Sequence, residues 1–81
     1  MSEKTIHSIL STMRDAKAIE DSVKKLNECG ITYASLMQLM REHKDKARVR
    51  TKLMQVAGLL VGARVKIANA VSEDFQEELK E

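Results

Sequence analysis

The sequence predicts an all-α protein, a compact five-helix bundle with a long C-terminal helix, and three observations support that fold class. The 81 residues are 43% hydrophobic and 32% charged, and the apolar side chains are almost all aliphatic, because only 2% of the residues are aromatic. Proline is absent and only three glycines occur, which disfavours a turn-rich β fold. Apolar residues recur at spacings of three and four, the period of an amphipathic helix. We expect a single helical domain over 1–81, since domains usually have ~100–150 residues.

The first helix is expected near the N-terminus. Apolar residues at i, i+3, i+4 and i+7 run from Ile6 to Met13. Thr5 and Ser2 are the candidate N-caps, because a hydroxyl can accept a hydrogen bond from the first turn of a helix.

The second helix has the clearest end in the sequence. Asp15 is a candidate N-cap, and apolar residues at i, i+4 and i+7 begin at Ile19. Gly30 can adopt the left-handed conformation that closes a helix, and Ile31 beyond it can pack back on Leu26. We therefore expect this helix to stop at Gly30.

A short third helix is expected after Thr32, another residue suited to an N-cap. Its apolar face comprises Leu36, Leu39 and Met40. The next six residues, 41–46, contain no apolar side chain. We therefore expect a loop or a frayed helix end there.

The last two helices are predicted on either side of Gly62, which breaks the apolar pattern. Apolar residues at i, i+4, i+7 and i+11 from Val49 to Leu60 predict the fourth helix. Within it, Gly58 either lowers stability by about 1 kcal/mol relative to alanine or marks a close helix contact. Beyond Gly62 an apolar residue recurs every four positions, which predicts a final helix running nearly to the C-terminus; these residues are Ala63, Ile67, Val71, Phe75 and Leu79.

The net charge of +2 combines three unlike segments. Residues 1–40 carry equal numbers of basic and acidic side chains. Residues 41–66 carry eight basic against two acidic residues, a net +6, and residues 67–81 carry one basic against five acidic residues, a net −4. Such a molecule can attract a copy of itself, or an anionic polymer on one side only. The plain alternative is that these charges form solvated faces.

Several classes of function are disfavoured. A core this small leaves little room for a substrate pocket with a catalytic shell, so we expect neither an enzyme nor a small-molecule substrate. His7, His43 and Cys29 lack metal-ligand spacing and no phosphate-binding glycine loop occurs, so we expect no metal and no cofactor. No apolar run approaches the ~18–20 residues of a membrane span. A lone cysteine without a secretory leader favours an intracellular protein, cytoplasmic or nuclear.

The methionines have two interpretations. Because methionine is flexible and polarisable, Met37, Met40 and Met54 could form an adaptable binding face together with Leu36 and Leu53. Core packing is the favoured interpretation, since so few aromatic side chains leave gaps that methionine can fill.

Three features of the segment 18–71 resemble a sterile alpha motif (SAM) domain. The first is the helix ending in Glu28-Cys29-Gly30-Ile31, and the second is a short helix over 32–39 with leucines at 36 and 39. The third and most specific is the run Leu60-Val61-Gly62-Ala63-Arg64-Val65-Lys66-Ile67. SAM domains commonly have there a glycine, one residue, an arginine, one residue, then a lysine and an aliphatic residue. The run 59–64 is also similar to the start of the last helix in the N-terminal SAM-like oligomerisation domain of the plant regulator LEAFY.

The resemblance implies a non-catalytic protein–protein interaction module that forms homo- or hetero-oligomers with another SAM domain. SAM domains typically join head to tail, with the start of the last helix docked on the acidic middle of the next copy. Independently, Gly62 permits a tight helix corner or the close approach of a partner backbone. Arg64 and Lys66 are cations at the positive end of a helix dipole, which favours an anionic partner unless both point into water. The expected partner-binding residues are Gly62, Ala63, Arg64, Lys66, Arg48, Arg50 and Lys52.

The alternative is a nucleic-acid-binding domain. SAM domains of the Smaug type grip RNA hairpins with a glycine-alanine-arginine turn, which Gly62-Ala63-Arg64 resembles, and basic residues within 41–52 would add phosphate contacts. Tyr33 and Phe75 are too sparse for a base-stacking platform. The residues alone leave both hypotheses open.

Overall fold

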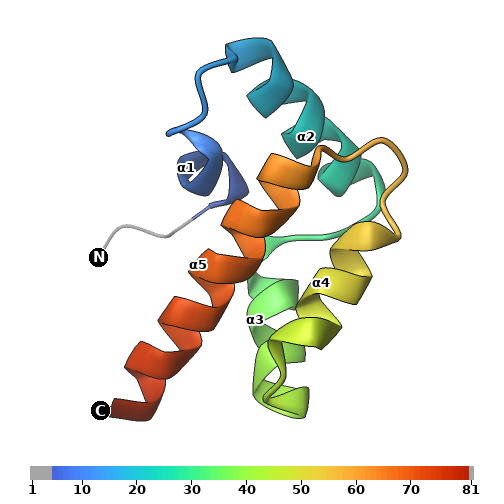
Figure 1. Ribbon diagram of the computed structural model, residues 1–81. Helices are drawn as coiled ribbons and strands as arrows, with labels where there is room; N and C mark the ends of the chain where they lie inside the picture. The colour runs from blue at the N-terminus through green and yellow to red at the C-terminus, as the bar shows by residue number, and fades with distance from the viewer. Residues whose placement is uncertain (1–4, 81) are drawn as a thin grey trace.

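The computed structural model describes residues 5–80, whose regular secondary structure is entirely helical (Figure 1). In chain order the helices are α1 (Ile6–Leu10), α2 (Ala16–Glu28), α3 (Tyr33–His43), α4 (Lys46–Met54) and α5 (Val61–Lys80). With 20 residues α5 is the longest of these. The expected all-α bundle with a long C-terminal helix is therefore confirmed.

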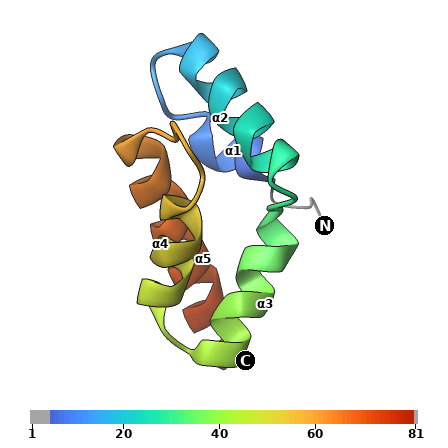
Figure 2. The ribbon, with the colours of Figure 1, turned by 90° about the vertical axis from the view of Figure 1, so that its right-hand side faces the viewer.

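The bundle is organised around α5. Figure 1 shows α5 running diagonally, with α1 on one side and α4 on the other, and Figure 2 shows α3 beside α4. The helices α1, α3 and α4 each pack on α5, whereas α2 packs chiefly on α1. The inner face of α5 has no solvent-exposed surface at Ala63, Ile67, Ala68 and Val71.

The apolar stripe of α5 is buried only over its first half. Ile67 and Val71 are fully buried, Phe75 is half-buried and Leu79 is 67% exposed. An α-helix turns by about 100° per residue, so a four-residue spacing advances by about 40° around the axis at every step. The stripe therefore rotates out of the core before the helix ends.

The predicted N-caps of the first three helices are present. Thr5 and Thr32 each accept a hydrogen bond from the backbone N–H three residues later, at 3.1 Å, and the serine there accepts one in return from the threonine N–H. Asp15 caps α2 through its carboxylate. Ser2, the other candidate cap, lies outside the described residues. These bonds satisfy backbone donors that a helix leaves unpaired in its first turn.

The end of α2 is also as predicted. Gly30 has a φ of +71°, in the left-handed region. The Gly30 N–H donates to the Asn27 carbonyl at 3.0 Å, and the Ile31 N–H donates to the Leu26 carbonyl at 2.9 Å. This pair of bonds is a Schellman motif, and the burial of Ile31 secures it.

The connection between α3 and α4 is shorter than expected. Residues 41–43, assigned from the sequence to a loop or a frayed end, continue α3 as regular helix. Lys44 then ends α3 in the left-handed region with a φ of +53°, and its N–H donates to the Met40 carbonyl at 2.7 Å. Asp45 immediately caps α4 by accepting from the Ala47 N–H at 2.9 Å. A final turn that faces solvent needs no apolar residue, so the lack of one did not mark the end of the helix.

The fourth helix was predicted to continue through Leu60, and that prediction is wrong. The helix α4 ends at Met54, and residues 55–60 form a loop that reaches α2 (Figures 1 and 2). Gly58 has a φ of +78°, and its carbonyl accepts a hydrogen bond from Lys25 Nζ on α2 at 3.1 Å. Val56 is buried within this loop, so an apolar residue at helical spacing reaches the core without a helix.

The sequence predicted that Gly62 would break the helical pattern. In the structure, Gly62 is instead the second residue of α5 and lies within regular helix. A Cβ atom at Gly62 would meet no atom within 4 Å. The described part of the chain therefore has no internal packing reason for a glycine there.

Two side-chain contacts hold α3 along the C-terminal half of α5. The Tyr33 hydroxyl donates to Asp74, and Arg41 makes two hydrogen bonds to Glu78, at 2.5 and 3.0 Å. Hydrogen bonding to Arg41 holds the pKa of the Glu78 carboxyl below its ordinary value and raises the pKa of Arg41. Each end of α3 is thereby attached to α5.

Substitution by alanine should change the free energy of unfolding in opposite directions at Gly58 and at Gly62. We expect Gly58→Ala to lower the free energy of unfolding by about 1–2 kcal/mol, because a left-handed conformation disfavours side chains. The added Cβ would also lie 3.0 Å from Lys25 Nζ. Gly62→Ala should raise that free energy by up to about 1 kcal/mol, since alanine is the better helix former. Urea unfolding of both variants measures the difference, and a neutral Gly58→Ala would contradict this account of the loop.

The Arg41–Glu78 pair predicts a pH-dependent contribution to stability. Because the pKa of Glu78 is lower in the folded than in the unfolded protein, the stabilisation is complete above the unfolded carboxyl pKa, ~4.3, and disappears as the pH falls through the folded pKa. The free energy that Glu78→Gln removes should be constant near neutral pH and vanish in acid. Urea unfolding over that range measures it, with Glu73→Gln as the control. A difference that does not change with pH would exclude this role.

Candidate interaction surface

Large hydrophobic side chains are exposed around the junction of α4 and α5. The structure describes five large hydrophobic residues as exposed, and only Leu79 lies away from this junction. The other four are Met54 (64% exposed), Leu60 (48%), Val61 (64%) and Val65 (49%). Exposed apolar residues that are scattered singly are ordinary, whereas a group of them on one face is a candidate interaction site.

Three of these residues share a shallow hollow with two arginines. Met54, Val61 and Val65 line a hollow of about 150 Å³ together with Arg50 and Arg64. We call these five residues the α4–α5 surface. No acidic residue lines it, so its positive charge is not offset locally.

The Arg64 side chain is incompletely satisfied. It is half-buried, and its Nε atom is buried without a hydrogen-bond partner among the described residues. Buried donors are usually paired, because an unmade hydrogen bond costs about 1–3 kcal/mol. No described residue pairs with the Arg64 guanidinium, which lines the hollow beside Arg50.

The helical phase of α4 explains why Arg50 and Met54 join this surface. Val49 and Leu53 are fully buried and define the inner face of α4. Arg50 and Met54 each follow one of these residues by one position, about 100° further around the axis. Lys46 lies on the same flank and donates to Asn69 of α5, which shows that this flank is the one next to α5.

The predicted partner-binding residues do not form one surface. Arg50 and Arg64 lie together in the α4–α5 surface. Arg48 and Lys52 are exposed on the opposite flank of α4, each one position before a buried residue. Lys66 turns toward the connection between α1 and α2, where its Nζ donates to the Thr12 hydroxyl at 3.1 Å.

The two remaining predicted residues differ in accessibility. Ala63 is fully buried, so its side chain belongs to the core. Gly62 is exposed beside Val61 and leaves open space over the first turn of α5. Of these two residues, only Gly62 is accessible to a partner.

Sequence reasoning missed the apolar part of this surface. Val61 and Val65 are four residues apart, as are Ala63 and Ile67. Two such stripes, about 160–200° apart on one helix, cannot both face the core. The second stripe was a usable signal of an exposed apolar face, whereas Met54 resembled the core methionines Met37 and Met40.

The N-terminus of α5 lacks a side-chain cap. The other four helices are capped by Thr5, Asp15, Thr32 and Asp45. Leu60 occupies the equivalent position in α5, since its carbonyl accepts from the Arg64 N–H at 3.0 Å, but its side chain has no acceptor. Unpaired N–H groups and the positive end of the helix dipole therefore lie at the edge of the α4–α5 surface.

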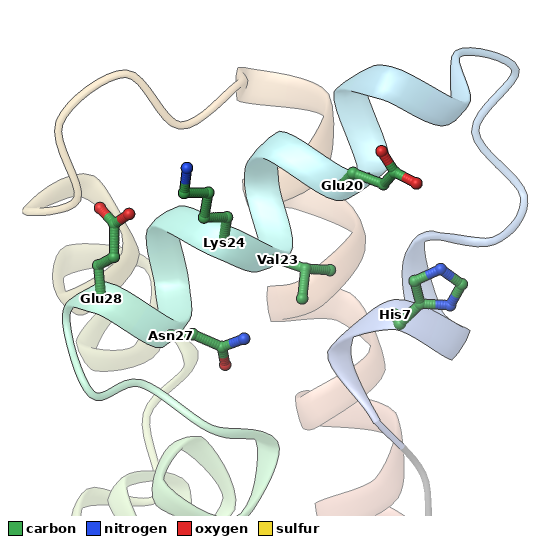
Figure 3. Close-up of a pocket in the computed structure, with 6 residues that line it drawn as sticks. All are labelled: His7, Glu20, Val23, Lys24, Asn27 and Glu28. Carbon is green, nitrogen blue, oxygen red and sulfur yellow. The ribbon is translucent and has the colours of Figure 1, made fainter.

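A larger hollow lies between α1 and α2 but has a different character (Figure 3). It measures about 510 Å³ and is lined by His7, Glu20, Val23, Lys24, Asn27 and Glu28. Val23 points into the space between the two helices. Glu20, Lys24 and Glu28 follow one another at four-residue spacing on α2, so the lysine lies between the two carboxylates and offsets one of their charges. The uncompensated α4–α5 surface is therefore the stronger candidate.

The remaining chemistry-bearing residues are dispersed. His7 is exposed on α1, Cys29 is exposed immediately after α2, and His43 ends α3. Residues 5–80 contain no group of three potential ligands that could hold a metal ion. Among the described helices, none combines the length and apolarity needed to cross a bilayer.

Comparison of the chain with protein-family models, curated proteins and solved structures found no match. The resemblance to SAM domains therefore stays a prediction.

The missing cap predicts a stabilising substitution. We expect Leu60→Asp to raise the free energy of unfolding by about 1 kcal/mol, because its carboxylate can accept from the first-turn N–H groups and complements the helix dipole. The matched control is Leu60→Lys, which removes the same exposed apolar side chain but supplies no acceptor. Urea unfolding compares the two variants. Equal effects of aspartate and lysine would show that the N-terminus of α5 is not short of acceptors.

Proposed function

We propose that the protein is a non-catalytic protein–protein interaction module whose α4–α5 surface docks an acidic, partly apolar surface of another chain. The observation that carries this proposal is the exposed cluster of Met54, Val61 and Val65 between Arg50 and Arg64. Methionine and arginine are enriched in protein interfaces, which commonly have an apolar centre and a polar rim.

The arginines favour a partner that presents carboxylates. Arginine binds a carboxylate through two parallel hydrogen bonds, and neither Arg50 nor Arg64 forms an ion pair with a described residue. The unpaired N–H groups at the start of α5 would donate hydrogen bonds to the same kind of ligand. A nucleic-acid backbone would satisfy the arginines but would leave the exposed aliphatic side chains without a partner.

The charge pattern also disfavours a two-fold symmetric contact through this surface. In such a contact each residue meets the same patch on the other copy, so Arg50 and Arg64 would face like charges. A partner surface that differs from the α4–α5 surface is therefore favoured. A second copy can provide it through another face, and so can a different helical domain. The sequence resemblance favours a SAM domain in either role, inside the cell.

Charge reversal tests this assignment. Sedimentation velocity over a series of concentrations should show self-association of the wild-type chain. Arg50→Glu combined with Arg64→Glu should weaken it at least about 30-fold, the effect of losing about 2 kcal/mol at an interface hot spot. The matched control, Arg48→Glu with Lys52→Glu, reverses the same charge on the other flank of α4 and should behave like wild type.

A partner other than a second copy requires one further measurement. If the wild-type chain is monomeric, an acidic amphipathic helical peptide serves as the probe, and amide chemical shifts are followed by NMR. The shifts should change around residues 50, 54, 61, 62, 64 and 65. A monomeric chain whose shifts do not respond there contradicts the proposal, as does a response to an RNA hairpin in place of the peptide.

A further inference from the structure

The flank of α4 opposite the α4–α5 surface carries a second group of cations. Arg48 and Lys52 are exposed there, and Lys44 precedes them at the end of α3. We call these three residues the outer cationic face. None of their side chains forms a hydrogen bond or an ion pair with a described residue. The proposed protein contact uses none of them.

The charge of α4 is not compensated within the helix. Its nine residues include four cations and no acidic residue. Lys46 and Arg50 are four apart, as are Arg48 and Lys52, and like charges at this spacing repel and destabilise a helix. The neighbouring carboxylate, Asp45, is engaged as the N-cap. An external polyanion would relieve this repulsion.

We infer that the outer cationic face binds the phosphate backbone of a nucleic-acid duplex without reading its bases. Arg48 and Lys52 are separated by about 6 Å of helix rise, so their two long side chains can reach neighbouring phosphates of one nucleic-acid backbone. Stacking on unpaired bases is not provided for, since the aromatic side chains, Tyr33 and Phe75, are both half-buried.

The distribution of apolar residues distinguishes a duplex from a membrane. Helices that lie on a bilayer insert an apolar face beside their cations. The exposed apolar side chains Met54, Val61 and Val65 lie instead in the α4–α5 surface. The outer cationic face is therefore suited to a soluble polyanion. This inference uses other residues than the proposed protein contact and stands independently of it.

The test measures salt dependence with neutral substitutions. Fluorescence anisotropy of the full chain with two short DNA duplexes of unrelated sequence should give equal affinities that fall with salt. Arg48→Gln with Lys52→Gln should reduce the slope of log K against log salt by about 1.8, because each phosphate contact contributes about 0.9. The matched control, Arg50→Gln with Arg64→Gln, removes the same charge and should leave the slope unchanged.

Three results would overturn the inference. The first is the absence of duplex binding at low salt. The second is an equal reduction of the salt slope in both pairs of variants, and the third is binding to vesicles containing phosphatidylserine but not to DNA. Circular dichroism checks that each variant is folded. Because the Arg50/Arg64 pair should lose protein association yet keep duplex binding, failure of this inference and failure of the proposed function are separable.

Discussion

Burial of the first half of α5 is the constraint on which the rest of the structure depends. Ala63 and Ala68 are small enough for neighbouring helices to approach closely, while Ile67 and Val71 fill the space between them. Three helices cover this inner face from different sides. The opposite side of the same turns cannot also be covered in so small a protein, since about 40% of the surface of such a chain stays exposed on folding. An outward apolar stripe at the start of α5 therefore stays exposed.

The position of that stripe is set by a contact distant in sequence. Lys25 on α2 holds the carbonyl of Gly58, whose left-handed backbone turns the chain before α5 begins. The loop thus places Val61 beside the end of α4 instead of continuing that helix. Because the same turn brings Arg64 near Arg50, two cations from separate helices share one hollow. The interaction surface is a product of the loop as much as of the helices beside it.

Features set by local chemistry could be predicted from the sequence. The caps at Thr5, Asp15 and Thr32 and the closure at Gly30 depend on hydrogen bonds spanning only two to five residues. The end of α4 could not be predicted, because Val56 is apolar at a helical spacing and the turn depends on distant Lys25. The assignment of the basic residues of α4 to two different flanks also required the structure. Burial of Val49 and Leu53 sets the rotation of α4 about its axis, and the position of α5 beside one flank separates Arg50 from Arg48.

The attachments of the helices differ, and this difference governs local unfolding. The helix α3 is fastened to α5 at both ends, whereas α2 packs chiefly on α1 and is hydrogen-bonded to the 55–60 loop through one lysine. Segments with fewer packed neighbours open at lower free energy than the whole molecule unfolds. The α1–α2 pair is therefore the region expected to exchange its amide hydrogens first. The α3–α4–α5 unit retains its shape during such opening, so the surface proposed for recognition belongs to the slowly exchanging part of the molecule.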